Sequence, residues 1–553
     1  MRILVIGAVA AGTSAAAKAR RNDEDAEIVI YERDTHISYS GCGMPYYIGG
    51  EIEKGEELTP RNPEFFRNKY NVAIRTEHEV LKLDKEKKEL EVKNLVTGEV
   101  FTDHFDRLIL ATGARSVVPP IKGVENAHVF TLRNINDMYR IKQYINNRSP
   151  RKAVIVGTGF IGLEMAENLR GLGMEVTMVE LLPQVSPGLD ADMAILVEEH
   201  LEKKDVRVVT NTYASEISEK NVLLSDGRKL DADLVILATG VRPNVKLAED
   251  AGIVLGVTGA IKVDSFMETS EKGIYAAGDC IEQYHSVTGK PVYRPLGSTA
   301  NKTGRIAGNN ITGGALEFRG VLGTGIYKVF DLTVAQTGLT EREAVKEGYD
   351  ISVSHNIKPD RPEYMGGKEM TIKSVADKKD GRLLGVQIVG PQGVDKRIDV
   401  FVALISFGAK VQDLVHLDLA YAPPFSTTKD PVMYTGMIQE NAIYGNRPLM
   451  TNEKLEELMS SGKKVRVIDT RVEKQFSASH VEHAENLPHA VIREKMKELD
   501  KDTITITYCN KGTTGNAVQN ILLNHGLKEV YNLSGGHKTY MRYRLLKKKS
   551  EKK

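Results

Sequence analysis

Residues 153–162 read Ala153-Val154-Ile155-Val156-Gly157-Thr158-Gly159-Phe160-Ile161-Gly162, an apolar strand that runs directly into a glycine-rich turn. A helical segment to about Leu172 and a second strand at 175–179 follow, and Glu180 stands at the end of that strand. In such a βαβ unit the glycines let backbone amides approach a pyrophosphate, and the carboxylate accepts hydrogen bonds from a ribose. The stretch therefore predicts a Rossmann-like nucleotide domain. Because a carboxylate repels a 2′-phosphate, NADH is favoured, with NADPH as the alternative.

The N-terminus repeats this pattern in a weaker form. Strand 2–6 leads into Gly7-Ala8-Val9-Ala10-Ala11-Gly12, then an alanine-rich helix and a strand that ends at Glu32. This loop lacks the middle glycine of the fingerprint, but Asp279, after a later short strand, offers a carboxylate suited to a flavin ribitol chain. Together these features favour FAD over a second nicotinamide nucleotide. The alternative for Asp279 is a helix cap.

A second motif is repeated after each of the two βαβ units. Residues 108–113 and 234–240 each close a buried strand with Ala-Thr-Gly, and each follows one βαβ unit. The strand at 273–277 returns after the second unit, so the second domain looks inserted into the first. We expect an α/β fold with two Rossmann-like domains, an FAD-binding domain at 1–113 and 241–324 and an NAD(H)-binding domain at 114–240.

The rest of the chain predicts two further modules. Alternating strands indicate an α+β interface domain at 325–445, followed by a linker at 446–453 and a C-terminal α/β domain at 454–553. The final lysine-rich run, 547–553, is typical of a solvated terminus.

Composition excludes several classes of function. With 75 Lys and Arg against 74 Asp and Glu, the chain carries no field that would recruit nucleic acid or acidic lipid. No apolar run is long enough to span a bilayer. Three distant cysteines and no export signal suit a cytoplasmic protein. The histidines of the C-terminal domain lack the spacing of a zinc site, so no metal is expected.

Cys42 has no neighbouring cysteine in the sequence. A Cys-x-x-Cys or Cys-x4-Cys pair closes an internal disulfide, whereas a single thiolate must form its sulfur–sulfur bond with a small molecule. Cys42 therefore points to a small-molecule substrate.

At this point residues 1–445 resemble the pyridine nucleotide-disulfide oxidoreductases. The run Cys42-Gly43-Met44-Pro45-Tyr46-Tyr47-Ile48-Gly49 resembles their single-cysteine branch, which contains coenzyme A disulfide reductases and persulfide reductases. Peroxidase and water-forming oxidase relatives carry a histidine in the first glycine loop, where this chain has Ala10-Ala11, so oxygen chemistry is disfavoured. Gly41 replaces the asparagine usual before the cysteine.

The resemblance also implies site residues and a homodimer formed through 325–445. Tyr421, and with less support Tyr364, match tyrosines that approach the active sulfur from the partner subunit; the alternative for both is an ordinary interface tyrosine. The implied binding residues are Gly7, Ala11, Gly12, Glu32, Arg33, Thr112, Gly113 and Asp279 for FAD; Gly157, Gly159, Phe160, Gly162, Glu180 and Gly240 for the nicotinamide nucleotide; and Lys18, Arg20, Arg21 and Ser38 for coenzyme A. The alternative for Phe160 is a core side chain, and the alternative for Lys18, Arg20 and Arg21 is a solvated helix face.

Residues 465–471, 480–488 and 504–509 resemble the motifs of rhodanese domains. Cys509 ends a strand before a glycine-containing turn and a helix, whose N-terminus favours a thiolate that can carry sulfane sulfur. Rhodanese loops usually have arginine where this chain has Thr514, which favours coenzyme A persulfide or polysulfide over thiosulfate as the donor; the alternative is a weakly active module. The alternative for Cys509 is a buried inert thiol, and this is the default for Cys280.

The expected activity is flavin-dependent reduction of coenzyme A persulfide, polysulfide or coenzyme A disulfide by NAD(P)H through Cys42, coupled to sulfur transfer by Cys509. The alternatives are an NADH oxidase or peroxidase, and a flavin redox sensor with a sulfur-binding tail.

Overall fold

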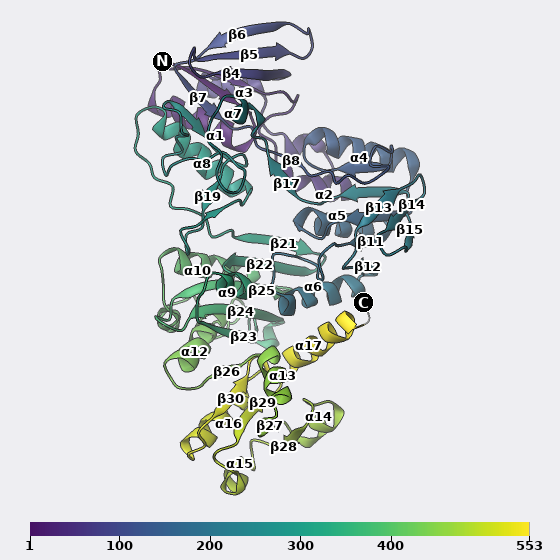
Figure 1. The fold of residues 1–553 in the computed structure, drawn as a ribbon, viewed down its shortest axis with the longest axis vertical. Coiled ribbons are helices and arrows are strands. Elements are labelled where there is room, and N and C mark those ends of the chain that lie inside the picture. The colour runs from purple at the N-terminus through teal and green to yellow at the C-terminus, as the bar shows by residue number, and fades with distance from the viewer. Residues whose placement is uncertain (552–553) are drawn as a thin grey trace. The chain divides into compact units, whose positions relative to one another are not determined.

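The computed structural model describes residues 1–551, with side chains through Lys549. Contacts divide the chain into two compact units, residues 1–181 with 212–323, and residues 182–211 with the chain from 324 onward. Figure 1 labels their elements. Within the described residues, none of the helices combines the length and the apolar character needed to cross a bilayer.

The first unit opens with a five-stranded parallel sheet of order β18-β7-β1-β2-β3. Strand β18 follows the second nucleotide fold in sequence, so the chain returns to complete this sheet. The strands are β1 (Arg2–Ile6), β2 (Glu27–Tyr31), β3 (Ala73–Arg75), β7 (Arg107–Leu110) and β18 (Ile274–Ala276).

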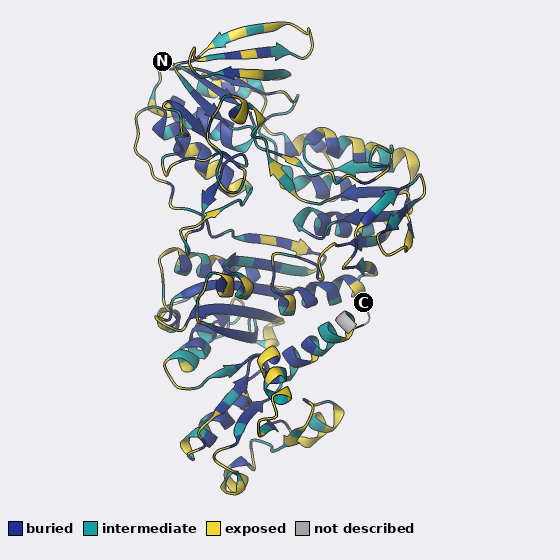
Figure 2. Ribbon diagram, viewed as in Figure 1, coloured by how far each residue is buried: buried dark blue, intermediate teal, exposed yellow. Residues whose placement is uncertain are grey.

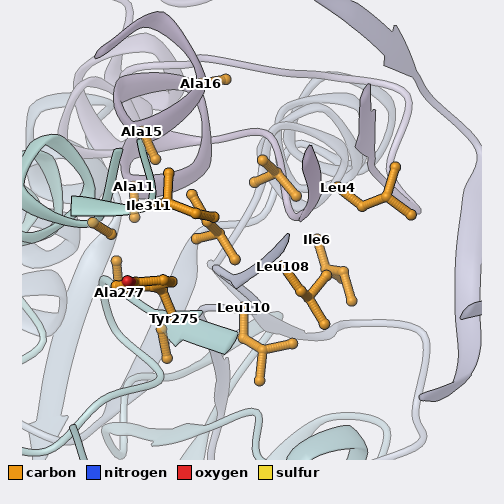
Figure 3. Close-up of a cluster of buried hydrophobic side chains, with 14 of the residues drawn as sticks. Leu4, Ile6, Ala11, Ala15, Ala16, Leu108, Leu110, Tyr275, Ala277 and Ile311 are labelled. Atoms are coloured by element: carbon orange, nitrogen blue, oxygen red, sulfur yellow. The ribbon is translucent and has the colours of Figure 1, made fainter. Parts of the chain in front are cut away.

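Helices α1 (Ala10–Asn22) and α8 (Gly297–Asn310) pack closely in this domain. A Cβ on Gly304 would lie 2.3 Å from the carbonyl oxygen of Ala11, and one on Gly308 would lie 2.2 Å from that of Ala15. Small residues therefore set the distance between the two helices. Figure 3 shows the core beside them, a buried cluster that includes Leu4, Ile6, Leu108 and Leu110 as well as the alanines of α1. The accessory elements are α2 (Met44–Gly49), α3 (Pro63–Tyr70), α7 (Lys246–Asp250) and the antiparallel strands β4 (His78–Asp84), β5 (Glu89–Asn94) and β6 (Val100–His104).

A second parallel sheet in the first unit has neighbouring strands in the order β11-β10-β16-β9. Helix α5 follows β10 through the glycine turn, as the fingerprint predicts. The elements are β9 (Val129–Thr131), α4 (Ile135–Arg148), β10 (Lys152–Val156), α5 (Phe160–Gly171), β11 (Glu175–Val179) and β16 (Leu234–Leu237), with the hairpin strands β13 (Ala214–Ile217), β14 (Asn221–Leu224) and β15 (Lys229–Asp231). Strands β8 (Ala114–Ser116) and β17 (Val241–Pro243) pair where the chain passes between the two sheets, and β19 (Gln283–Tyr284) pairs with β20 (Pro291–Val292).

The second unit contains an antiparallel sheet of order β21-β22-β25-β24-β23. Figure 2 shows its long central strands as buried. The elements are β21 (Gly325–Val329), β22 (Leu332–Gly338), α9 (Glu341–Lys346), β23 (Ile351–Pro359), β24 (Glu369–Asp377), β25 (Leu383–Gly390), α10 (Val394–Ser406), α11 (Val411–Val415) and α12 (Pro431–Ile443).

Helix α6 (Ala191–Lys203) and strand β12 (Val206–Val209) belong to this second unit, although their sequence lies inside the range predicted for the NAD(H) domain. A buried ion cluster explains the attachment. The ammonium of Lys373 on β24 lies 2.8 Å from a carboxylate oxygen of Asp192, 3.2 Å from Asp190 and 2.7 Å from Glu341. The predicted domain boundaries stay predictions.

The chain ends in a parallel sheet of order β26-β30-β29-β27-β28, also in the second unit. Its last helix, α17, was expected to end in a solvated lysine tail, yet Lys549 Nζ lies 2.7 Å from both Glu198 and Glu202 of α6. The elements are β26 (Leu449–Met450), α13 (Asn452–Ser460), β27 (Val465–Asp469), α14 (Glu473–Ala478), β28 (Ala484–Asn486), α15 (Ile492–Lys495), β29 (Ile504–Tyr508), α16 (Thr513–Asn524), β30 (Val530–Leu533) and α17 (Gly536–Glu551). The observed α/β architecture confirms the predicted fold class.

Candidate functional site

The two glycine turns of the first unit are built alike. Gly7 and Gly157 have φ of 105° and 103°, a conformation that favours glycine. A Cβ on Gly7 would lie 2.2 Å from the carbonyl oxygen of Ala111, and one on Gly157 would lie 2.3 Å from that of Ala238. The repeated Ala-Thr-Gly segments thus supply the backbone against which each turn packs.

The last glycine of each turn sets the distance between helix and strand. A Cβ on Gly12 would lie 1.8 Å from the carbonyl oxygen of Gly7, and one on Gly162 would lie 2.2 Å from that of Gly157. Gly159 has no atom within 4 Å of the Cβ position, so open space lies beside the start of α5. This geometry suits a pyrophosphate at the helix N-terminus.

A carboxylate accepts hydrogen bonds from each of the two turns. Glu32 accepts a hydrogen bond of 2.7 Å from the backbone amide of Ala8. Glu180 accepts bonds of 2.9 and 2.6 Å from the amide and hydroxyl of Thr158. Both carboxylates are buried at the end of a strand, the position from which a ribose hydroxyl is bound in this type of fold.

A cavity of about 470 Å³ opens beside the first turn. Seven of the eight residues predicted for FAD line the cavity: Gly7, Ala11, Glu32, Arg33, Thr112, Gly113 and Asp279. Gly12 is not among the lining residues. The cavity extends between Glu32 and Asp279, carboxylates that suit the ribose and ribitol hydroxyls of FAD. The residues present therefore fit this cofactor.

The sequence did not indicate several other residues of this wall, among them Tyr39, His78, Arg115 and Arg133. Arg133 lies 2.9 Å from the carboxylate of Asp279 and donates to the carbonyl oxygen of Ala114. It precedes helix α4 in the inserted domain, with no local motif that marks it. Asp279 is thus held by an ion pair, and no helix begins at it, because the next elements are the short strands β19 and β20; the helix-cap alternative is wrong.

Cys42 lies on a short 3₁₀ turn, Gly41–Gly43, directly before α2, and is exposed. Helix α2 packs against the fingerprint helix α5, where a Cβ on Gly49 would lie 2.0 Å from the side-chain oxygen of Asn168. Partial desolvation raises the pKa of the Cys42 thiol, and the negative charges of Glu164 and Asp279 raise it further, against the opposing effect of Arg133.

Glu164, on α5, is an ionisable group near Cys42 whose pKa is strongly shifted. Burial raises the pKa of Glu164 to about 7, and the charge of Glu167 adds to the shift. Its charge therefore changes near neutral pH, in electrostatic contact with Cys42. Glu164 could not be recognised from the sequence, because a glutamate on an amphipathic helix carries no distinctive signal.

The other residues predicted for substrate differ in exposure. Arg20 is buried and donates to backbone carbonyls, including Tyr70 at 2.9 Å and Ala26 at 2.6 Å, so it stabilises the local fold. Lys18 is half-buried and donates to Asn22, Arg21 is exposed, and Ser38 donates its backbone amide to Ala8. A coenzyme A contact by Lys18, Arg21 or Ser38 stays a prediction.

The nicotinamide prediction includes two residues outside the turn itself. Phe160 is the first residue of α5 and half-buried, and Gly240 is exposed after β16.

Cys280 is fully buried, and burial raises the pKa of its thiol. This burial agrees with an inert thiol.

Tyr421 and Tyr364 lie in the second unit. Tyr421 is 48% exposed and lines a cavity of about 630 Å³ with Arg361, Arg397 and Phe425. Tyr364 is 76% exposed on a 3₁₀ turn and does not line this cavity. The wall is anchored by the buried ion pair of Arg397 with Asp430, 2.8 Å long.

Cys509 is buried at the end of β29, before a loop that leads into α16. The loop backbone is fixed by α17, because His537 and Lys538 donate their amides to the carbonyls of Cys509 and Asn510 at 2.8 and 3.1 Å. Arg471 donates to the side chain of Asn510 at 3.2 Å. Thr514 lies in the first turn of α16.

The matched family models define the class of protein. A model described as pyridine nucleotide-disulphide oxidoreductase matches residues 1–294, the dimerisation domain of the same family matches 325–431, and a rhodanese-like domain matches 451–542. The chain belongs to the pyridine nucleotide-disulphide oxidoreductases. The predicted resemblance is confirmed, the family implies FAD and NAD(P)H, and the dimerisation domain indicates a homodimer.

Individual relatives are more specific than the family models. The chain is 39% identical over 438 residues to an NAD(P)H sulfur oxidoreductase (CoA-dependent) of Pyrococcus furiosus, covering 78% of this chain and 97% of the relative. It is 37% identical over 437 residues to an NADH oxidase of Methanocaldococcus jannaschii, with the same coverage. It is 32% identical over 436 residues to a coenzyme A disulfide reductase of Staphylococcus haemolyticus, covering 79% and 98%.

Two solved structures match the chain including its C-terminal module. Reduced CoADR-RHD of Bacillus anthracis has a TM-score of 0.95 and 38% identity, covering 98% of both chains. An NAD-dependent persulfide reductase from A. fulgidus has a TM-score of 0.90 and 37% identity, covering 98% of this chain and 100% of its own.

Proposed function

We propose that the protein reduces coenzyme A persulfide, polysulfide or coenzyme A disulfide with NAD(P)H through Cys42, and that Cys509 transfers sulfane sulfur. The observation that carries the proposal is the exposed free thiol of Cys42, directly before helix α2, which packs against the fingerprint helix α5. The two other cysteines are buried and free. Cys42 therefore has no internal disulfide partner and must react with an external sulfur compound.

The residues of the first cavity would hold FAD: Glu32 at the ribose, the amides of the Gly7 turn at the pyrophosphate and Asp279 at the ribitol chain. Bound there, the flavin would accept hydride from the nicotinamide and deliver two electrons to sulfur. The protein contributes the fixed turn, the Arg133–Asp279 ion pair and the position of Cys42.

Glu180 supports NADH as the preferred reductant. Its buried carboxylate stands at the end of β11, where a 2′-phosphate would meet a negative charge. We expect kcat/KM for NADH to exceed that for NADPH by about tenfold or more, the size of one charge interaction of about 1.4 kcal/mol. Equal values for the two reductants would contradict this part of the proposal.

The sulfur chemistry at Cys42 balances with two electrons from NAD(P)H. Its thiolate attacks coenzyme A persulfide at the sulfur bound to carbon, forming a mixed disulfide with coenzyme A and expelling hydrogen sulfide anion. With coenzyme A disulfide the same attack expels one coenzyme A thiolate. Two electrons then cleave the mixed disulfide and release coenzyme A, which restores Cys42.

Tyrosine hydroxyls from the partner subunit support this step in the proposal. Tyr421 is exposed at the cavity wall, and a phenol that donates to a leaving sulfur stabilises its developing charge. Tyr364 is the weaker candidate because it stands apart from that cavity.

The decisive experiment compares steady-state rates for coenzyme A disulfide, coenzyme A persulfide and polysulfide, each with NADH and NADPH, under anaerobic conditions. We expect NADH-dependent release of sulfide or coenzyme A from purified protein with oxidised-flavin absorbance. NADH consumption that requires oxygen and yields no thiol would instead favour the NADH oxidase alternative. Slow turnover accompanied by a conformational change on persulfide binding would favour the redox-sensor alternative.

A further inference from the structure

Lys358, the penultimate residue of β23 in the interface domain, reaches the loop of the rhodanese-like module. Its ammonium nitrogen lies 3.5 Å from the hydroxyl oxygen of Thr513, the first residue of α16. On its other side the ammonium lies 4.1 Å from the centre of the Tyr434 ring. The side chain is therefore held between α12 and the helix that follows the Cys509 loop.

The strand that carries Lys358 is fixed to the module by direct hydrogen bonds. Ser534, which follows β30, donates or accepts at the Nδ1 of His355 over 2.9 Å and accepts from the His355 amide at 2.8 Å. Two residues later, a Cβ on Gly536 would lie 2.2 Å from the carbonyl oxygen of Cys509. Hydrogen bonds and close packing thus connect the strand of Lys358 to the backbone at Cys509.

Lys358 is half-buried, and across residues 1–549 no carboxylate pairs with it. Neighbouring cations differ in this respect, since Lys511 and Lys538 both pair with Glu369. Burial lowers the pKa of Lys358, the charges of Lys511 and Lys429 lower it further, and Cys509 raises it. A desolvated cation without a counter-ion is costly, so the missing negative charge is expected at the thiol.

The other charged groups around the loop are already compensated or neutral. Arg471 pairs with Asp469 at 2.6 Å. Burial and the charge of Arg471 lower the pKa of His537 to about 4, so this imidazole is neutral at pH 7. Lys429, which precedes α12, is exposed and therefore strongly screened.

We propose that Lys358 completes the Cys509 site from the interface domain and that the site takes anionic persulfide or polysulfide donors. This inference rests on the proposed sulfur transfer at Cys509. The Cys509 thiolate attacks the outer sulfur of the donor, a new sulfur–sulfur bond forms, and the donor bond breaks with its electron pair on the leaving thiolate. No oxidant is needed, and after loss of its proton the Cys509 persulfide again carries one negative charge. One ammonium group therefore stabilises both states.

The test uses full-length flavoprotein carrying Cys42→Ser, in which Cys509 is the remaining reactive thiol because Cys280 is fully buried. The pH profile of Cys509 alkylation by iodoacetamide is followed by mass spectrometry of the Cys509 peptide. Lys358→Gln is expected to move the midpoint upward by about one pH unit and to slow alkylation at pH 7 about tenfold. Lys358→Arg is expected to keep the parent profile.

Lys463→Gln is the matched control, an exposed lysine of the same module. It is expected to leave the profile unchanged, and in protein with intact Cys42, Lys358→Gln is expected to leave coenzyme A disulfide reduction unchanged. Coincident profiles for Lys358→Gln, Lys358→Arg and the parent would overturn the inference.

Failure of the proposed function has a separate signature. Incubation of the Cys42→Ser parent with coenzyme A persulfide is expected to add the mass of one sulfur to the Cys509 peptide. No adduct would contradict sulfur transfer by Cys509, whereas the alkylation profile alone decides whether Lys358 acts on the thiol.

Discussion

At the scale of single residues, Cys42 is not prepared as a thiolate by its own chain. Desolvation, Glu164 and Asp279 raise the pKa of its thiol, and Arg133 alone opposes them. We expect the positive potential or hydrogen bonding that favours the reactive anion to come with the bound cofactor, the substrate or the tyrosines that we propose for the partner subunit. This arrangement limits the reaction of Cys42 with other thiols in the absence of substrate.

The first prediction concerns Glu164. Because the ionised carboxylate raises the Cys42 pKa, Glu164→Gln is expected to lower that pKa and to increase the rate of Cys42 alkylation about two- to tenfold at pH 8. Below pH 6, where Glu164 is protonated in the parent, the two proteins should react at similar rates. The measurement is the pH dependence of iodoacetamide labelling in the holoenzyme.

Glu175→Gln serves as its control, since Glu175 is exposed at the start of β11. Equal alkylation rates of the Glu164→Gln protein and the parent at pH 8 would show that Glu164 does not act on Cys42.

At the scale of elements, the glycine turns follow directly from the sequence. Gly7, Gly12, Gly157 and Gly162 leave no room for a Cβ, so their spacing predicts both nucleotide folds and the carboxylate that ends each second strand. The ion pair of Arg133 with Asp279 could not be predicted, because the two residues are far apart in the sequence. The attachment of α6 could not be predicted either, because Asp190 and Asp192 pair with Lys373 about 180 residues further on, a contact without a local pattern.

The second prediction concerns this ion cluster. Lys373→Met leaves Asp190, Asp192 and Glu341 without their shared cation, so we expect the free energy of unfolding to fall by about 3–5 kcal/mol. The measurement is urea denaturation followed by circular dichroism. Lys378→Met removes an exposed pair with Asp350 and should cost less than about 1 kcal/mol. Similar losses in both variants would contradict the structural role of the cluster.

The third prediction is the pH dependence of the same cluster. Although burial opposes it, Lys373 and His355 hold the pKa of Asp192 well below its usual range. A lowered carboxyl pKa contributes stability that is present above the unfolded pKa of about 3.9 and is lost as pH falls through the folded value. We therefore expect acid to destabilise the parent more than Asp192→Asn between pH 5 and 2, measured as the shift in urea midpoint. Parallel midpoints for both proteins would contradict this sign.

At the scale of the whole molecule, the family architecture could be predicted because each module carries its own motif. The reductase and rhodanese patterns lie in separate stretches, and the matched families confirm both. The sequence could not indicate the contact of Lys358 with Thr513, at the start of the helix that follows the Cys509 loop, because this contact joins two modules that each look complete alone.

The fourth prediction concerns the dimer. Phe425 is 68% exposed beside Tyr421, and an apolar side chain so placed in a dimerisation domain is expected to be covered by a second copy. Phe425→Glu should shift the protein from dimer to monomer in analytical ultracentrifugation and lower reductase activity at least tenfold. Val257→Glu, at an 86% exposed position of the first unit, is the control. A dimer that persists in Phe425→Glu would exclude this surface.

The central claim is that Cys42 carries electrons from the nicotinamide nucleotide to external sulfur, and one measurement tests it most directly. Anaerobic sulfide release from coenzyme A persulfide is followed with NADH for the parent, Cys42→Ser and Cys509→Ser, each with its flavin content determined. Cys42→Ser is expected to bind flavin normally but to lose at least 1,000-fold in rate, on the order of 4 kcal/mol in the barrier, whereas Cys509→Ser is expected to reduce the persulfide still. Sulfide release by Cys42→Ser at the parent rate would contradict the central claim.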